Sequence, residues 1–97
     1  MKTAIPKING IKFEFGQLCF TAGAREKLTD NERLKALIRH AVGDWGYLTD
    51  DDWHDNEDAI VWGGRLLSSY RSDLGERFWI ITEADRSVTT VLLPEEY

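Results

Sequence analysis

Three runs rich in aromatic, aliphatic and β-branched residues occupy the last third of the sequence and constrain the fold more than any other feature. They are Arg65 to Arg71, Arg77 to Thr82 and Ser87 to Leu93, and residues of these types favour β-strands. The segments between them, 72–75 and 84–86, each contain an Asp and are typical of tight turns. The pattern predicts a three-stranded antiparallel meander, which must bury one face against another layer.

Two helices are predicted upstream of these runs. Thr29 followed by Glu32 is a capping-box pattern, and apolar residues then recur at helical spacing until Gly43: Leu34, Leu37, Ile38, Ala41 and Val42. A second helix is expected to begin at a cap on Thr49 or Asp50 and to run through about residue 62, where two glycines follow.

The N-terminal part adds one predicted strand and a short helical turn. Ile11 to Phe15 alternate apolar and polar residues, which is typical of a half-buried strand, and Leu18 to Phe20 are interpreted as its continuation. Residues 22–28 favour the helical turn. We therefore expect a single domain, residues 1–97, of the α+β class: an antiparallel three- to four-stranded sheet with two or three helices packed on one face.

The composition excludes several classes of protein. A hydrophobic content of 42% argues against intrinsic disorder. Cys19 is the single cysteine, so the chain has neither an internal disulfide nor a thiolate zinc cluster, and a reducing, cytoplasmic location is expected. No apolar stretch approaches the roughly 20 residues of a membrane span, and no signal peptide is recognised. Neither a membrane nor secretion is therefore expected.

The acidic residues are concentrated in one stretch. Residues 1–43 carry eight Lys or Arg and four Asp or Glu (+4), residues 65–97 carry four and six (−2), and residues 44–64 carry seven acids and no Lys or Arg (−7), which gives the net −5. This charge argues against direct binding to nucleic acid. It predicts instead a protein partner with a basic, nucleic-acid-binding surface, contacted by the seven acids: Asp44, Asp50, Asp51, Asp52, Asp55, Glu57 and Asp58.

Three of these acids form one stripe on the second predicted helix. At about 100° per residue, Asp51, Asp55 and Asp58 fall on the side opposite Trp53 and Ile60, which are predicted to be buried. At about 1.5 Å rise per residue, neighbouring carboxylates of the stripe lie roughly 4.5 to 6 Å apart along the axis. That spacing is similar to the spacing of phosphates along a nucleic-acid strand, so the stripe can occupy Arg and Lys groups that normally hold phosphates.

A solvated helix face explains part of the same pattern. In the first turn of a helix, Asp50, Asp51 and Asp52 interact favourably with the helix dipole. Most helices also present charged side chains to water. However, like charges at i,i+4 cost about 0.2–0.5 kcal/mol, and no Lys or Arg interleaves with these acids. The residues by themselves leave both interpretations open. Trp45 and Tyr47, in the glycine-flanked break before the helix, are predicted as exposed aromatic anchors of an interface.

The sequence supports metal binding and catalysis less well than partner binding. A calcium loop starting at Asp50 fails, because its sixth residue is Asp55 instead of Gly and its twelfth is Val61 instead of Glu. His54 and Asp58 at i,i+4, with a neighbouring Asp, leave a metal-dependent hydrolase open as an alternative. No catalytic motif occurs, so we predict no enzymatic activity, catalytic residue, metal or cofactor.

Four segments carry a resemblance to known proteins: Gly43-Asp44-Trp45-Gly46, Gly64 to Tyr70, Trp79 to Ser87, and Leu92 to Tyr97. With them, residues 11–97 resemble a family of short proteins carried on plasmids and prophages, whose motif implies no activity. The size and acidity are also similar to those of phage-encoded anti-CRISPR proteins that inhibit the type I-F surveillance complex.

This resemblance implies a mode of action. The chain would bind the RNA-guided complex where its Cas8 and Cas5 subunits meet, imitate the target DNA duplex and so block DNA recognition. The acidic stripe would then stand in for phosphates, although the resemblance supplies no list of contact residues. An antitoxin or regulatory partner of a plasmid-encoded protein is the alternative of another class.

Overall fold

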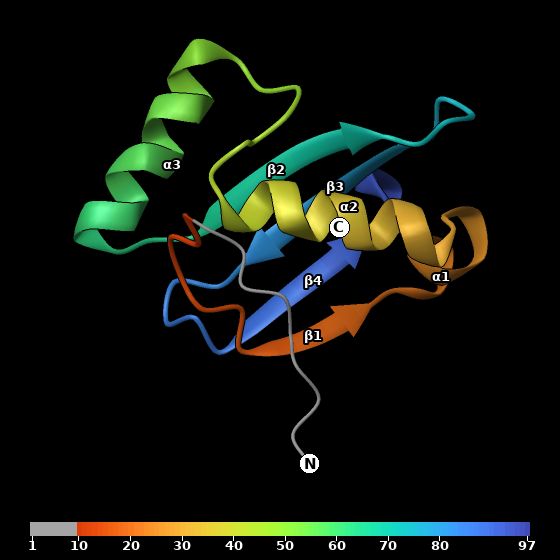
Figure 1. Cartoon of the computed structure of the whole chain (residues 1–97), viewed down its shortest axis with the longest axis horizontal. Coiled ribbons are helices and arrows are strands. Elements are labelled where there is room, and N and C mark those ends of the chain that lie inside the picture. Colours follow the sequence, from red (N-terminus) through yellow and green to blue (C-terminus); the bar gives the residue numbers. More distant parts are fainter. Residues whose placement is uncertain (1–9) are drawn as a thin grey trace.

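Four strands and three helices make up the fold of residues 10–97, the part of the chain that this computed structural model describes. The class is α+β, as predicted (Figure 1). In chain order the elements are β1 (Gln17–Phe20), α1 (Ala22–Lys27), α2 (Asp30–Ala41), α3 (Asp50–Trp62), β2 (Leu66–Arg71), β3 (Arg77–Thr82) and β4 (Val88–Leu92), followed by a 3-10 helix (Pro94–Glu96).

The sheet has the strand order β1-β4-β3-β2. β2 pairs antiparallel with β3, and β3 pairs antiparallel with β4, which confirms the predicted meander. β1 lies parallel to β4, with Gln17 opposite Val88 and Phe20 opposite Val91, so the sheet is mixed and not wholly antiparallel as predicted. The parallel direction follows because α1 and α2 return the chain along the sheet before the meander begins (Figure 1).

The predicted strand at Ile11 to Phe15 is wrong, because this segment packs beside α2 without joining the sheet. The ring of Phe13 lies 5.1 Å from that of His40. The amide of Lys12, next to it, donates to the carbonyl of Ala41 at the end of α2. The alternating pattern correctly marks a half-buried face, but such a face packs on a helix as well as in a sheet. Gly16, with a φ of 64°, then turns the chain into β1.

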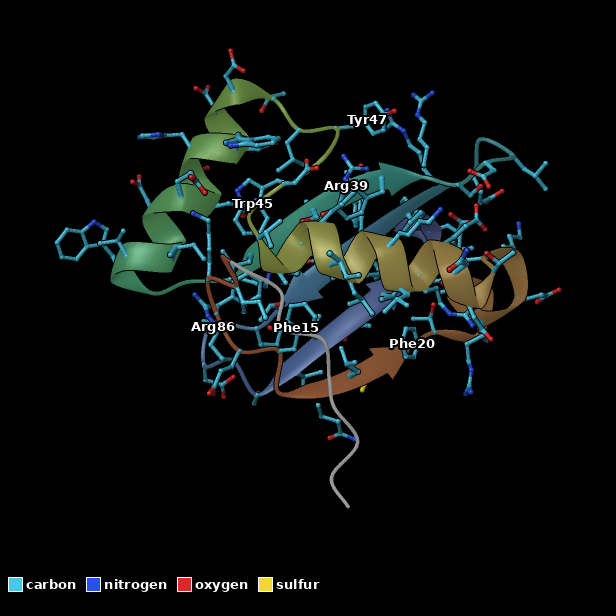
Figure 2. The ribbon with its side chains drawn as sticks, viewed as in Figure 1. Phe15, Phe20, Arg39, Trp45, Tyr47 and Arg86 are labelled. Carbon is cyan, nitrogen blue, oxygen red and sulfur yellow. The ribbon has the colours of Figure 1, made fainter. Side chains whose placement is uncertain are left out.

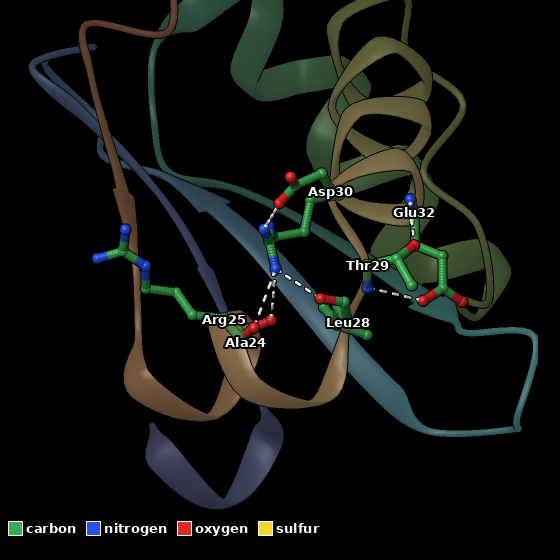
Figure 3. Close-up of polar contacts among 7 residues, drawn as sticks. Ala24, Arg25, Leu28, Thr29, Asp30 and Glu32 are labelled. Atoms are coloured by element: carbon green, nitrogen blue, oxygen red, sulfur yellow. Dashed lines mark hydrogen bonds and ion pairs between the residues drawn. The ribbon is translucent and has the colours of Figure 1, made fainter.

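α2 crosses one face of the sheet (Figure 1). Thr29 and Glu32 form the predicted capping box, with bonds of 2.9 and 3.1 Å between side chain and backbone. The guanidinium of Arg33 ties α2 to α1 by donating to the carbonyls of Ala24 (3.1 Å) and Leu28 (2.6 Å) (Figure 3). Beneath these helices lies the larger core cluster: Ala24, Leu28, Ala36, Leu37, Tyr70, Phe78, Ile80, Val91 and Leu93.

α3 lies beside β2, beyond the edge of the sheet in Figure 1. A second core cluster, of Trp45, Ala59 and Leu66, fills the space between α3, β2 and the segment that contains Phe13. No helix within residues 10–97 combines the length and apolarity needed to cross a membrane.

Candidate acidic interface

The acidic face belongs to α3, whose N-terminus is capped as predicted. Thr49 is the N-cap, and its hydroxyl accepts a 3.1 Å hydrogen bond from the amide of Asp52. Asp50 and Asp51 share the first turn with Asp52, so their negative charges lie at the positive end of the helix dipole.

Asn56 fixes which side of α3 faces the protein. Its side-chain nitrogen donates to the carbonyl of Leu67 at 2.7 Å, and its oxygen accepts from the amide of Leu67 at 3.1 Å. Asn56 and Ala59 are buried, whereas Trp53 and Ile60, which were predicted to be buried, are half-buried. The side of the helix facing the protein is therefore centred on residues that the apolar pattern did not mark.

Arg86 holds the C-terminal end of α3, which has no basic residue of its own in its last turn. Its guanidinium donates to the carbonyls of Ala59 (3.0 Å) and Gly64 (2.6 Å). The β3–β4 turn aims this side chain, because Arg86 has a φ of 60° and Asp85 accepts the amide of Ser87 at 3.0 Å. The hydroxyl of Ser87 also bonds Asp85 and holds the pKa of its carboxyl below the ordinary value.

The acids of α3 are all exposed, including the three of the predicted stripe. Among the described residues, none of them lies within 4.0 Å of a Lys or Arg nitrogen, and Asp58 alone has a basic neighbour, His54, at 3.8 Å. Asp51, Asp55 and Asp58 share one side of the helix, Asp50, Asp52 and Glu57 lie around that stripe, and Glu57 also accepts a hydrogen bond from the Trp45 indole. We call this set the acidic face: Asp50, Asp51, Asp52, Asp55, Glu57 and Asp58.

Asp44 differs from the other acids, because it forms an ion pair with a base of the same chain. Arg39 binds it through two hydrogen bonds, of 2.8 and 3.2 Å, and this contact lowers the pKa of the Asp44 carboxyl. The same guanidinium lies over the ring of Tyr70, whose hydroxyl donates to the carbonyl of Asp44 at 2.6 Å. Asp44 therefore holds the loop before α3 against α2 and β2.

The prediction that Trp45 is exposed is wrong, since this side chain is fully buried. Its ring stacks on Phe13 and meets His40 edge to face, and its indole nitrogen donates to a carboxylate oxygen of Glu57 at 3.0 Å. The flanking glycines suggested a surface break, but Gly46 instead lets the loop run close to β2, where a parallel bridge joins it to Ser69. Figure 2 shows Trp45 between α2 and α3.

Tyr47 is exposed, as predicted, with 60% of its surface accessible. The guanidinium of Arg71 lies 5.3 Å from the centre of its ring, so a cation already occupies one side of it. Its amide donates to the carbonyl of Ser69 at 2.7 Å, which fixes the backbone below the ring.

Trp62, which sequence reasoning had not selected, is 83% exposed at the end of α3. It follows Asp58 by four residues and Asp51 by eleven, so at about 100° per residue it lies in the same stripe. The helical spacing that groups the three acids is therefore the sequence signal that identifies Trp62. The acidic stripe thus ends in a large exposed aromatic ring.

His40 is the centre of a buried polar cluster. Its Nε2 lies 2.9 Å from the hydroxyl of Thr82, its Nδ1 contacts the hydroxyl of Ser68, and Thr82 bonds Thr89 at 2.8 Å. Burial, and secondarily the charge of Arg86, lowers the pKa of His40 to about 3. The ring is therefore neutral at pH 7, although it lies in the last turn of α2, where a positive charge would interact favourably with the helix dipole.

No family model, curated protein or solved structure matches this chain. What its surface can bind is therefore inferred from its own side chains. Within residues 10–97, no group of three or more His, Cys, Asp or Glu side chains is arranged to hold a metal ion, and His54 and Asp58 have no third ligand beside them. The acidic face, with its terminal Trp62, is the surface with the most distinctive chemistry.

Proposed function

We propose that this chain is a non-enzymatic inhibitor that presents its acidic face to a basic, nucleic-acid-binding surface of a protein partner. The observation that carries the proposal is the row of exposed acids on α3, none of which lies within 4.0 Å of a Lys or Arg of the described chain. Acids that only solvate a helix are commonly interleaved with bases, because the like charges otherwise repel one another.

The geometry of a helix supports imitation of phosphates. Asp51, Asp55 and Asp58 are spaced by roughly 4.5 to 6 Å along the axis of α3. Thr49 caps the start of this helix locally, while Arg86 and the Asn56–Leu67 bonds hold its end and its middle to the rest of the fold. A rigid row of carboxylates loses little conformational entropy on binding. It can form charge-assisted hydrogen bonds with Arg and Lys groups that otherwise contact a nucleic-acid backbone.

Aromatic side chains supply the apolar part of the interface. Trp62 takes the anchoring role that the sequence had given to Trp45, because it is exposed and ends the stripe. Tyr47, in the loop that leads into α3, is another exposed ring. Trp and Tyr are enriched among the residues that contribute most to binding, and an Arg of the partner can also stack on either ring.

The resemblance to type I-F anti-CRISPR proteins supports a specific partner. In this proposal the chain acts in the cytoplasm of a bacterial host, binds the RNA-guided surveillance complex at its Cas8 and Cas5 subunits, and prevents the complex from binding target DNA. No catalytic step is involved, so inhibition is stoichiometric.

A mobility-shift assay with purified type I-F surveillance complex and its double-stranded target tests the proposal. The wild-type chain should bind the complex and abolish the DNA shift, and raising the salt concentration should weaken its binding. Asp51→Asn with Asp55→Asn should bind about tenfold or more weakly, because charge-assisted bonds are lost.

The matched control is Glu26→Gln with Glu95→Gln, which removes two exposed acids from other elements and changes the net charge equally. It should inhibit like the wild type. Equal loss of inhibition in both double variants would mean that inhibition depends on the net charge of the chain and not on the acidic face. Salt-insensitive binding would favour the antitoxin-like alternative, and no binding at low or high salt would reject this complex as the partner.

A further inference from the structure

β1 presents an open edge of the sheet, because it is the outermost strand and no described segment pairs with its other side. The amides of Gln17 and Thr21 point to β4, where they donate to the carbonyls of Ser87 (2.8 Å) and Val91 (3.1 Å). Since main-chain groups alternate along a strand, those of Leu18 and Phe20 point away from β4. Exposed main-chain groups of this kind favour pairing with another strand.

An apolar groove runs along this open edge, between β1, residues 11–15 and α2. Its volume is about 410 Å³. Leu18 and Leu34 are 44% and 56% exposed, and Ile11 and Ile38 add further apolar surface next to them. In Figure 2, Phe15 and Phe20 lie toward opposite ends of β1 on this side of the molecule. Contiguous exposed apolar surface beside an open edge is characteristic of an interface.

Opposite charges lie at the two ends of the groove. Glu14 lines one end of the groove, near Ile38. At the other end an adjoining hollow, which shares Leu18 and Leu34 with the groove, continues it to Arg25, near Phe20. Both side chains are exposed, and neither forms an ion pair with a described residue. A twofold axis across the middle of β1 exchanges the two ends, so that Glu14 of one copy faces Arg25 of the other. The surface is thus complementary to itself in charge as well as in hydrogen bonding.

We propose that a second copy of this chain occupies the groove, through antiparallel pairing of the two β1 strands about a twofold axis at Cys19. Leu18 of each strand then exchanges main-chain hydrogen bonds with Phe20 of the other, and the two Cys19 residues form the central non-hydrogen-bonded pair. The exposed Leu34 and Ile38 of the two α2 helices cover each other. α3, beyond the opposite edge of the sheet, stays accessible, so this inference does not depend on the proposed function.

Sedimentation equilibrium of the full chain tests the dimer. The wild type should be dimeric at high micromolar concentration, whereas Leu34→Asp should be monomeric, because it places a charge in the apolar contact. Leu74→Asp is the matched control, since Leu74 is 97% exposed in the β2–β3 turn, away from β1. It should leave the dimer unchanged. Far-UV circular dichroism verifies that both variants are folded.

Cross-linking through the native Cys19 tests the register. In a central non-hydrogen-bonded pair the Cα atoms lie about 4.5 Å apart, which is within the range of a disulfide. Diamide, which accepts the two electrons and two protons of the thiol pair, should therefore give a covalent dimer that is lost in Cys19→Ser and Leu34→Asp. A wild type that is monomeric up to millimolar concentration, or a dimer that neither cross-links nor responds to Leu34→Asp, would overturn the proposal.

Discussion

His40 is a buried base that the fold keeps neutral. Its ring is completely enclosed, and its nitrogens contact the hydroxyls of Ser68 and Thr82. Protonation would place an unpaired charge among these groups and close to Arg86, which is why its pKa falls to about 3. The side chain is thus a structural part of the core, and its position offers no route to a substrate.

This burial predicts that stability depends on pH. Because the pKa of His40 is lower in the folded state than its unfolded value of about 6.5, its contribution is complete above pH 6.5 and is lost as the pH falls toward 3. The free energy of unfolding should therefore fall by about 2 kcal/mol between pH 7 and pH 5. Urea titrations at both values measure it. His40→Gln should lose this dependence, whereas His54→Gln, a change on the exposed side of α3, should keep it.

Two tryptophans near the acidic face should separate stability from binding. Trp45→Ala removes a fully buried ring and should cost about 3–5 kcal/mol of unfolding free energy. Trp62→Ala, at an 83% exposed position, should change stability by no more than about 0.5 kcal/mol. It should weaken binding to the surveillance complex about 30-fold, as expected of an aromatic anchor. Thermal unfolding and competition binding measure the two effects, and unchanged binding would remove Trp62 from the interface.

α3 is an element whose own sequence supplies only part of what holds it. Thr49 caps its first turn locally, but its last turn lacks a basic residue and receives Arg86 from the β3–β4 turn. Asn56, buried in its middle, bonds both main-chain groups of Leu67 on β2. The acidic face is therefore held in place by two contacts from other elements.

The Arg86 contact predicts the stability of the end of α3. Arg86→Ala should lower the free energy of unfolding by about 2–3 kcal/mol, because the carbonyls of Ala59 and Gly64 lose a charged donor. Hydrogen exchange in the last turn of α3 should become faster. Arg77→Ala, at an exposed position on β3, is the control with little expected effect.

Arg86→Gly distinguishes this contact from backbone strain. Gly suits the φ of 60° at this position but has no guanidinium. If the side-chain contact stabilises α3, this variant should also be destabilised. Stability equal to or above that of the wild type would mean that the turn conformation alone matters.

At the scale of the whole molecule, the acidic face and the open edge are well separated. α3 lies beyond β2, at one edge of the sheet, whereas β1 forms the other edge (Figure 1). Pairing through β1 would leave the acidic faces of the two copies accessible at opposite ends of the dimer. Such a dimer could bind two partners, or two sites of one partner, without either interface interfering with the other.

The sequence by itself determined the type and order of most elements. Capping at Thr29 and Thr49, the helical spacing of apolar residues and the three β-rich runs are local signals, and they predicted α2, α3 and the meander correctly. The exposure of the acidic stripe was predicted from the same spacing, because the period of a helix determines which side chains share one face.

Only the tertiary structure decided how these elements are joined. The parallel pairing of β1 with β4, the burial of Trp45 and the contact of Arg86 with α3 all connect segments far apart in the chain. Local periodicity shows that a face is apolar, but not which surface covers it or which loop reaches a helix end. Those choices depend on how the whole chain packs, which is why the Ile11 to Phe15 segment was mistaken for a strand.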